Sequence, residues 1–229
     1  MVNDYSIITI GYKSLENIKN RVDESFDGPN PPSEFILIIN YYSEVSWDIL
    51  DYAKNEKRIT RFSFNSQNIG FAKGMNQGYR ISKSKNLIVL NDDCSINQST
   101  LTGLVDLLNH ENVGISSILI GRYPNDNVET PQGFILGLDR NMIDNIGGYI
   151  YDEIASPLGC ERELTYRANY HGYKLKTDSN LYFKHAHDIS SNTSTLINYM
   201  GDLMSPLGEN AFQYETLKKL DEKINLYKK

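Results

Sequence analysis

The sequence predicts an α/β fold, with a mostly parallel sheet flanked by helices within a single domain. Strand-like and helix-like segments alternate through the first half of the chain, which is the pattern of repeated βα units. The run at residues 87–90 is apolar at every position, which is typical of a strand covered on both faces. A length of 229 residues suits one sizeable core.

Four βα units are expected in the first half. The strand and helix pairs are 5–10 with 14–26, 35–39 with 47–55, 58–64 with 71–84, and 86–90 with 98–110. Ser14 is the expected cap of the first helix, and the segment 28–32, rich in Gly and Pro, is a rigid loop within the domain.

The second half is less regular. The expected order is a loop at 122–130, a strand at 132–138, a short helix from Asn141, a turn at Gly147 and Gly148, a helix at 160–171, and extended segments at 174–177 and 181–185. Apolar residues near helical spacing in 209–227 predict a C-terminal helix that docks on the domain or forms an interface.

Composition narrows the classes of partner. A net charge of −6 without a Lys/Arg stripe argues against nucleic-acid binding, so an anionic substrate needs a local cation or a helix N-terminus to receive it. Cys94 and Cys160 are far apart and lie outside any C-x-x-C spacing, so both are expected to be small buried fillers. The absence of a long apolar run or signal peptide pattern predicts a cytoplasmic protein with no integral membrane segment.

Asn91-Asp92-Asp93 follows the apolar run directly. The carboxyl ends of strands in an open α/β sheet are where ligands bind, and paired carboxylates there suit Mg²⁺ or Mn²⁺ bridging to phosphates. The alternative is an Asp that caps the helix from Gln98.

Gly70, Gly74 and Gly78 recur every four residues and form one helical face. Such a face permits close approach of a ligand or of a strand, and the sequence leaves both open. Asn68 and Asn76 on the same segment could serve a ligand, or be a helix cap and a surface residue.

Four stretches together resemble the family 2 glycosyltransferases, nucleotide-sugar enzymes with the GT-A fold. Residues 7–12 are similar to the family's opening strand and loop, and residues 68–78 to its N-x-G-x-x-x-G-x-N-x-G stretch. Residues 90–93 stand where the family has its D-x-D-type metal motif. Residues 147–149 and 160–167 are similar to its Gly-Gly-Phe and E-D-x-D-L-x-x-R elements. The resemblance covers residues 5–190 and implies a GT-A domain at 1–204, with a nucleotide-sugar-binding half at 1–121, an acceptor-binding half at 122–204, and a C-terminal helix at 205–229.

The resemblance also implies roles for individual residues. The nucleotide-binding residues would be Thr9, Gly11, Tyr12, Asn40, Asn68, Gly70, Phe71, Lys73, Asn76, Asn91 and Asp92. Asp93 would bind Mn²⁺ or Mg²⁺, and Asp92 the ribose or a metal-bound water. A His after the last strand would complete the metal site. His185 and His187 share a face of an extended segment, and we favour His185.

Three positions depart from the family pattern. Asn40 stands where the family typically has an Asp, and an amide can both accept and donate, which leaves the base preference open. Asn91 replaces the first acid of the metal motif, which could lower metal affinity. Cys160 takes the place of the Glu before the family's catalytic base, and Glu161 takes the place of the base.

Glu161 and Glu163 are two residues apart on one helix, so they point to different faces. Glu163 stands four residues before Arg167, the favoured spacing for an ion pair, whereas Glu161 has no such cation. Glu161 is therefore the predicted base, kept ionised by the helix N-terminus after Gly159. The alternative is a first-turn Glu that only stabilises its helix.

The predicted function is metal-dependent, inverting transfer of a sugar from a nucleoside diphosphate to a glycan or another hydroxyl acceptor. Nucleotidyl transfer is a second possibility, although Gly11-Tyr12-Lys13-Ser14 lacks that class's Gly-rich, basic loop. A catalytically silent nucleotide-sugar or glycan-binding module is a third, because Asn40, Asn91 and Cys160 all depart from acidic positions.

Overall fold

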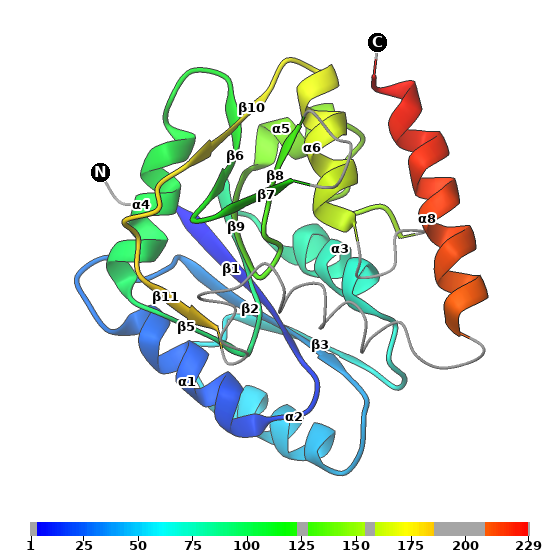
Figure 1. Ribbon diagram of the computed structural model, residues 1–229. Helices are drawn as coiled ribbons and strands as arrows, with labels where there is room; N and C mark the ends of the chain where they lie inside the picture. Colours follow the sequence, from blue (N-terminus) through cyan, green and yellow to red (C-terminus); the bar gives the residue numbers. More distant parts are fainter. Residues whose placement is uncertain (1–3, 123–127, 154–158, 186–208, 229) are drawn as a thin grey trace.

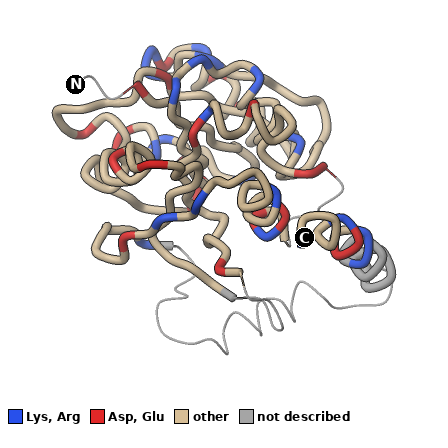
Figure 2. The backbone as a smooth tube through the Cα atoms, turned by 90° about the horizontal axis from the view of Figure 1, so that it is seen from above, with Lys and Arg blue, Asp and Glu red and all other residues tan. Residues whose placement is uncertain are grey.

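The computed structural model describes residues 4–122, 128–153, 159–185 and 209–228. A central sheet lies between two layers of helices (Figure 1), which confirms the predicted α/β class. Charged residues of both signs are interspersed over the described part of the backbone (Figure 2).

Seven strands form the sheet. Their order is β10 (Lys174–Thr177), β6 (Val113–Ser117), β9 (Ile135–Asp139), β4 (Asn86–Leu90), β1 (Tyr5–Gly11), β2 (Glu34–Asn40) and β3 (Arg61–Asn65). Neighbouring strands are parallel except at β9, which is antiparallel to β4 and β6. The carboxyl ends of β4, β1 and β2 therefore meet at one edge.

Helices pack on both faces of the sheet. One layer contains α1 (Leu15–Phe26), α2 (Val45–Asn55) and α4 (Gln98–Leu108), and the other contains α3 (Phe71–Ile81), α5 (Arg140–Asn145), α6 (Cys160–Tyr170) and α8 (Glu209–Leu226). Each layer shares a cluster of buried apolar side chains with the sheet, because alternate residues of a strand face opposite sides. Ile7 belongs to one cluster and Ile8 to the other.

The caps of α1 and α4 test two predictions, namely that Ser14 caps the first helix and that an Asp of residues 92–93 could cap the helix from Gln98. The Ser14 hydroxyl accepts a hydrogen bond from the Asn17 backbone N–H at 3.1 Å, as the sequence predicts. α4 is capped by Asn97, whose side-chain oxygen accepts from Thr100 N–H at 2.9 Å. Asp92 and Asp93 therefore do not cap α4, and the short strand β5 (Cys94–Ile96) separates them from it.

Three short strands, at 94–96, 120–122 and 129–131, were not expected from the sequence, whereas the strand at 183–185 lies within the predicted extended segment 181–185. β5 pairs antiparallel with β11 (Phe183–His185), and β7 (Ile120–Arg122) pairs with β8 (Glu129–Pro131) at the two ends of the predicted loop. Residues 123–127, inside that loop, lie outside the described residues. Three-residue strands are too short to show a periodicity, so their pairing depends on distant partners.

The C-terminal helix α8 docks on α6, as one of the two predicted alternatives has it (Figure 1). Leu220 and Ile224 of α8 are buried, and Leu220 lies against Gly159 at the start of α6. Arg162 forms an ion pair with Asp221, which joins the same two helices. In the part of the chain that the structure describes, no helix has the length and apolar character to cross a membrane.

Candidate functional site

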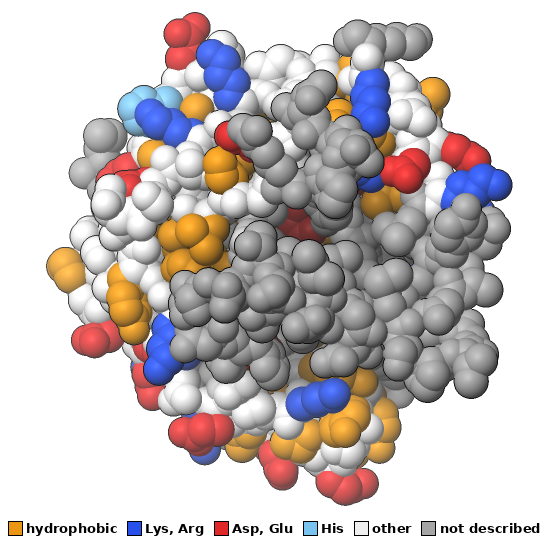
Figure 3. All heavy atoms as spheres, in the orientation of Figure 1, with side chains coloured by type: hydrophobic (Ala, Val, Ile, Leu, Met, Phe, Trp, Pro, Cys, Tyr) orange, Lys and Arg blue, Asp and Glu red, His pale blue; other side chains and the backbone are white. Residues whose placement is uncertain are grey.

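A cleft of about 380 Å³ opens at the carboxyl edge of β1, β2 and β4. Its lining residues are Ile10, Tyr12, Asn40, Asn68, Gly70, Phe71, Asn91, Asp92 and Asp93. Seven of these nine were predicted as nucleotide-binding residues and one, Asp93, as a metal ligand. On the face seen in Figure 3, charged side chains lie mainly toward the rim and hydrophobic ones appear in small groups.

The segment 91–93, which we call the acid tip, forms one end of the cleft. The Asn91 backbone N–H donates to the carbonyl of Phe134 at 2.9 Å, so the tip is held against the residue that precedes β9. Burial, and then the charge of Asp93, raise the pKa of Asp92 to about 6. Two carboxylates held close together in a partly buried place favour a cation between them.

The acid tip also contains an unsatisfied oxygen. The Asn91 Oδ1 atom is buried and has no hydrogen-bond partner among the described residues. A buried carbonyl oxygen without a donor is costly, and hard divalent cations take such oxygens together with carboxylates. The amide of Asn91 and the carboxylates of Asp92 and Asp93 therefore fit Mg²⁺ or Mn²⁺ by donor type.

His185 is brought close to the acid tip by strand pairing. In the β5–β11 pair, His185 stands opposite Cys94, the residue after Asp93. The structure describes the backbone of His185 but not its side chain, and His187 lies outside the described residues. Within the described ranges, no group of three or more His, Cys, Asp or Glu side chains could hold a metal ion.

An ion pair between a buried Arg and a partly exposed Glu of α1 supports β5. The Glu24 carboxylate accepts hydrogen bonds from the Ser95 hydroxyl at 2.7 Å and the Ile96 backbone N–H at 3.0 Å. It also pairs with Arg21 at 2.9 Å, and Arg21 is only 4% exposed. Burial lowers the pKa of Arg21, and the charges of Glu24, Asp92 and Asp93 act in the opposite direction. This support was not predicted, because α1 and β5 are far apart in the chain.

The opposite end of the cleft is built from asparagines and an aromatic pair. Asn40, at the end of β2, donates hydrogen bonds to Asn68 Oδ1 at 3.2 Å and to the Gly70 carbonyl at 3.4 Å. The Tyr12 ring meets Tyr42 edge-on with 4.9 Å between centroids, and the Lys13 ammonium lies within 5.4 Å and 5.2 Å of the two centroids. Lys13 and Tyr42 were not predicted, and both contact Tyr12 without being among the residues that line the cleft.

Two predicted nucleotide-binding residues lie inside the sheet. Thr9 is fully buried and its hydroxyl donates to the Leu90 carbonyl at 3.0 Å. A side chain added at Gly11 would meet Ile49 and Leu37 at 3.3 Å, so this glycine serves helix packing. For both residues, the structure shows contacts within the sheet layers, and neither lines the cleft.

The glycine face of α3 packs on β1. A Cβ at Gly74 would come within 2.7 Å of Ile10, and one at Gly78 within 2.3 Å of Ile8. The packing alternative therefore holds for these two glycines. Gly70 differs, since it precedes α3 with a positive φ of 86°, faces open space and lines the cleft.

Asn76 has a role that the sequence did not predict. It is 1% exposed, and its Oδ1 atom accepts hydrogen bonds from the backbone N–H groups of Ile150 and Tyr151 at 2.9 and 3.0 Å. Its amide group donates to the Tyr151 carbonyl at 2.8 Å and to Glu153 at 3.3 Å. All four hydrogen-bonding positions are used, so Asn76 anchors the segment before α6 and has no capacity left for a nucleotide. Lys73 is exposed and does not line the cleft.

Glu161 lies in the first turn of α6, which begins after Gly159 in a left-handed conformation. Its carboxylate packs so closely on Gly133 that a Cβ there would overlap it. Burial raises the pKa of Glu161 to about 7, which is opposite in direction to the effect expected of the helix N-terminus. A carboxylate with this pKa can exchange a proton near neutral pH.

Tyr151 connects Glu161 with the cleft. It is fully buried, and its ring packs on Phe71, a cleft residue, with 5.4 Å between centroids. The pKa of the Tyr151 hydroxyl is raised first by burial and then by the charge of Glu161. Phe71 lines the cleft together with the acid tip, whereas Glu161 is not among the lining residues and is related to the cleft only through Tyr151.

Glu163 forms the predicted ion pair with Arg167, at 2.8 and 3.1 Å. Both side chains are almost completely buried. Arg167 also donates to the carbonyls of Ile146, Tyr149 and Ile150, so it fixes the segment that leads to Tyr151. Glu163 is therefore structural, as the spacing indicated.

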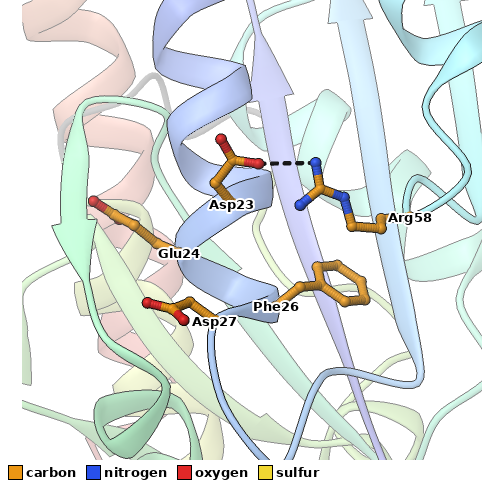
Figure 4. Close-up of a pocket in the computed structure, with 5 residues that line it drawn as sticks. All are labelled: Asp23, Glu24, Phe26, Asp27 and Arg58. Carbon is orange, nitrogen blue, oxygen red and sulfur yellow. Dashed lines mark ion pairs between the residues drawn. The ribbon is translucent and has the colours of Figure 1, made fainter.

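A second cavity, of about 430 Å³, lies at the end of α1 and is lined by Asp23, Glu24, Phe26, Asp27 and Arg58 (Figure 4). α1 runs back from the carboxyl edge of the sheet, so this cavity is at the edge opposite the cleft. Arg58 is paired with Asp23 and with Glu56, each at 2.8 Å. The Arg58 charge is therefore neutralised by two carboxylates of the protein, and we assign no chemistry to this cavity.

The family described as glycosyl transferase family 2 matches residues 6–189. A search of curated proteins found no match to the sequence.

Solved structures with this fold include three at 13–14% identity. A mannosyltransferase from Pyrobaculum calidifontis in complex with GDP-Man and Mn²⁺ has a TM-score of 0.67 over 94% of this chain and 68% of its own. A fragment of S. aureus TarS in complex with UDP-GlcNAc has 0.64 over 96% and 66%, and GalNAc-T7 with UDP, GalNAc and Mn²⁺ has 0.64 over 80% and 43%. This chain thus spans less than two thirds of the last two proteins.

Proposed function

The chain belongs to glycosyl transferase family 2, and from that premise we propose that it transfers a sugar from a nucleoside diphosphate to an acceptor hydroxyl, with a divalent cation and with inversion. The observation that carries this proposal is the acid tip. It places Asp92, Asp93 and the unsatisfied Asn91 oxygen at one end of a cleft at the carboxyl edge of the sheet.

The donor would lie along the cleft. Asp93, and His185 through the β5–β11 pair, would hold Mn²⁺ or Mg²⁺, whose charge would offset that of the diphosphate. Tyr12 and the asparagines at the other end would contact the nucleoside. Solved structures of this fold in complex with GDP-Man and Mn²⁺ and with UDP-GlcNAc support this class of donor.

Glu161 would act as the general base. It would remove the proton of the acceptor hydroxyl as that oxygen attacks the anomeric carbon, and the bond to the diphosphate breaks on the opposite face. A single displacement of this kind inverts the anomeric centre, through an oxocarbenium-like transition state. The acceptor would be a glycan or another hydroxyl compound that reaches Glu161 from the side of α6.

The test of this function is release of nucleoside diphosphate from a panel of nucleotide sugars, with and without Mn²⁺. Glycosyltransferases hydrolyse their donors slowly when the acceptor is missing, so release that needs Mn²⁺ supports the proposal. Tight binding of a nucleotide sugar with no release would instead assign the chain to the catalytically silent modules.

The Asp93→Asn variant should lose the effect of the metal on nucleotide binding. A neutral amide is a weaker ligand for a hard cation, so we expect Mn²⁺ affinity to fall by at least roughly tenfold. Titration of Mn²⁺, followed by thermal stabilisation in the presence of UDP or GDP, measures this. Asp106→Asn, an exposed change on α4, is the matched control, and an equal response of the two variants contradicts the assignment of Asp93.

The rate of transfer should depend on pH through Glu161. Since a general base must be ionised and the pKa of Glu161 is about 7, the rate should fall by about tenfold per pH unit below 7 and level off above it. The measurement is kcat/KM between pH 5.5 and 8.5 at saturating Mn²⁺. A profile that stays flat from pH 5.5 to 8.5 argues against Glu161 as the base.

A further inference from the structure

Five polar side chains form a connected chain behind one end of the cleft, which we call the amide chain. Its members, in order, are Ser63, Gln77, Asn65, Asn40 and Asn68. The Gln77 amide donates to the Ser63 hydroxyl at 2.8 Å, and the Asn65 amide donates to Gln77 Oε1 at 2.9 Å and to Asn40 Oδ1 at 3.1 Å. The Asn40 amide donates in turn to Asn68 Oδ1 at 3.2 Å. The chain joins β3, α3, β2 and the segment before α3.

The backbone of Gly70 fixes the direction of this chain. Its N–H donates to Asn68 Oδ1 at 2.9 Å, so this atom of Asn68 must be the oxygen. Its carbonyl accepts from the Asn40 amide at 3.4 Å, so the nitrogen of Asn40 must point toward residues 68 and 70. The oxygen of Asn40 then faces Asn65, which must donate to it.

Position 40 is therefore a place where only an amide satisfies every partner. Asn40 is 2% exposed, and two acceptors and one donor surround it. An ionised carboxylate accepts hydrogen bonds but donates none, so at this position it would face two oxygens without a proton. Asn40 is also the position at which members of the resembled family typically carry an Asp.

We propose that Asn40 is a positioning residue, which links residues 68–70 to the rest of the amide chain through both of its donated hydrogen bonds and thereby holds them against the donor cleft. The proposal rests on the proposed function in one respect, namely that the cleft binds a nucleoside diphosphate. Asn68 and Gly70 line that cleft, and Phe71 begins α3 beside them. A loss of order in this segment lowers nucleotide affinity, because binding must then restore the order.

The amide chain predicts different results for the same substitution at two adjacent members. At position 68 the Asn oxygen accepts from both Gly70 N–H and Asn40, and a carboxylate can accept both bonds as well. At position 40 the substitution removes both donated bonds. Asn68→Asp and Asn40→Asp add the same charge at the same end of the cleft, so a comparison of the two variants matches the long-range repulsion between that charge and the nucleotide, while position 40 is the buried one of the two.

The experiment compares the full chain with Asn40→Asp and Asn68→Asp, by calorimetric titration with UDP and with GDP in Mn²⁺ and by thermal melting. At pH 8 we expect Asn40→Asp to lose about tenfold more affinity than Asn68→Asp and to melt at a lower temperature, because unsatisfied buried groups are costly. A protonated carboxyl can donate one bond. The differences in nucleotide affinity and in melting temperature between the two variants should therefore become smaller toward pH 5.5. Each affinity and melting temperature is compared with that of the unchanged chain at the same pH.

Equal losses of affinity and equal melting temperatures in the two variants would overturn the proposal, as would a difference that does not change with pH. If Asn40→Asp does not fold, Asn68→Ala replaces it, since it removes the acceptor at the exposed end of the chain. Asn68→Ala should then melt below Asn68→Asp, and equal melting contradicts the proposal. Failure of the unchanged chain to bind any nucleoside diphosphate would refute the proposed function, while the melting temperatures still test the amide chain.

Discussion

Replacing Glu161 with Gln is expected to lower turnover by about 10²–10⁴-fold, while donor affinity stays nearly the same. The amide keeps the size of the side chain against Gly133 but cannot accept the proton of the acceptor hydroxyl. The measurement is kcat with saturating donor and acceptor, together with donor binding by calorimetry. Full transfer activity in this variant contradicts the role of Glu161.

Thermal melting separates loss of the base from loss of the fold. The pKa of Glu161 is raised from 4.5 to about 7 by burial, so between these values the folded chain binds more protons than the unfolded chain. Stability contributed by this group is therefore complete below pH 4.5 and is lost as the pH rises through 7. Glu161→Gln removes this loss, and at pH 8 it should melt no lower than the unchanged chain. Glu111→Gln, on the surface, is the matched control.

Arg167→Met is expected to cost about 3–5 kcal/mol of the free energy of unfolding, the largest effect on stability that we predict. Arg167 is 1% exposed, pairs with Glu163 and donates to the carbonyls of three residues. The substitution would leave a buried carboxylate without its cation and three carbonyls without these donors. Urea unfolding followed by circular dichroism measures the cost.

A double variant distinguishes the charge from the packing. Arg167→Met with Glu163→Leu removes both charges, so it should be more stable than Arg167→Met alone, since a buried pair can often be replaced by apolar residues. Arg80→Met, at an exposed position of α3, is the control and should change stability by less than about 0.5 kcal/mol. A cost below about 1 kcal/mol for Arg167→Met would contradict the account of this pair.

Local signals predicted much of the fold. β4 spans residues 86–90, as predicted from the apolar run at 87–90, and Ser14 caps α1 because its side chain accepts a hydrogen bond from a neighbouring backbone N–H. The Glu163–Arg167 pair depends on residues four apart on one helix, and such a spacing is visible in the sequence. The position of the acid tip follows similarly from the end of β4.

Features that depend on distant partners were not predictable. Asn76 is fixed by the backbone of residues 150 and 151, and Glu24 by β5, so nothing near them in the chain shows these roles. Thr9 and Gly11 are neighbours in sequence of residues that line the cleft, but both face the interior. The sequence could not predict this, because an apolar strand buried on both faces does not reveal which of its residues meet a ligand. The raised pKa of Glu161 likewise depends on burial by elements far away in the chain.

Calorimetric titration of UDP and GDP, with Mn²⁺ and with EDTA, tests the central claim most directly. If the acid tip holds a divalent cation that grips the diphosphate, at least one nucleotide should bind much more tightly with Mn²⁺, and Asp93→Asn should abolish the difference. Equal affinity in Mn²⁺ and EDTA, or a Mn²⁺ effect unchanged in Asp93→Asn, would contradict it.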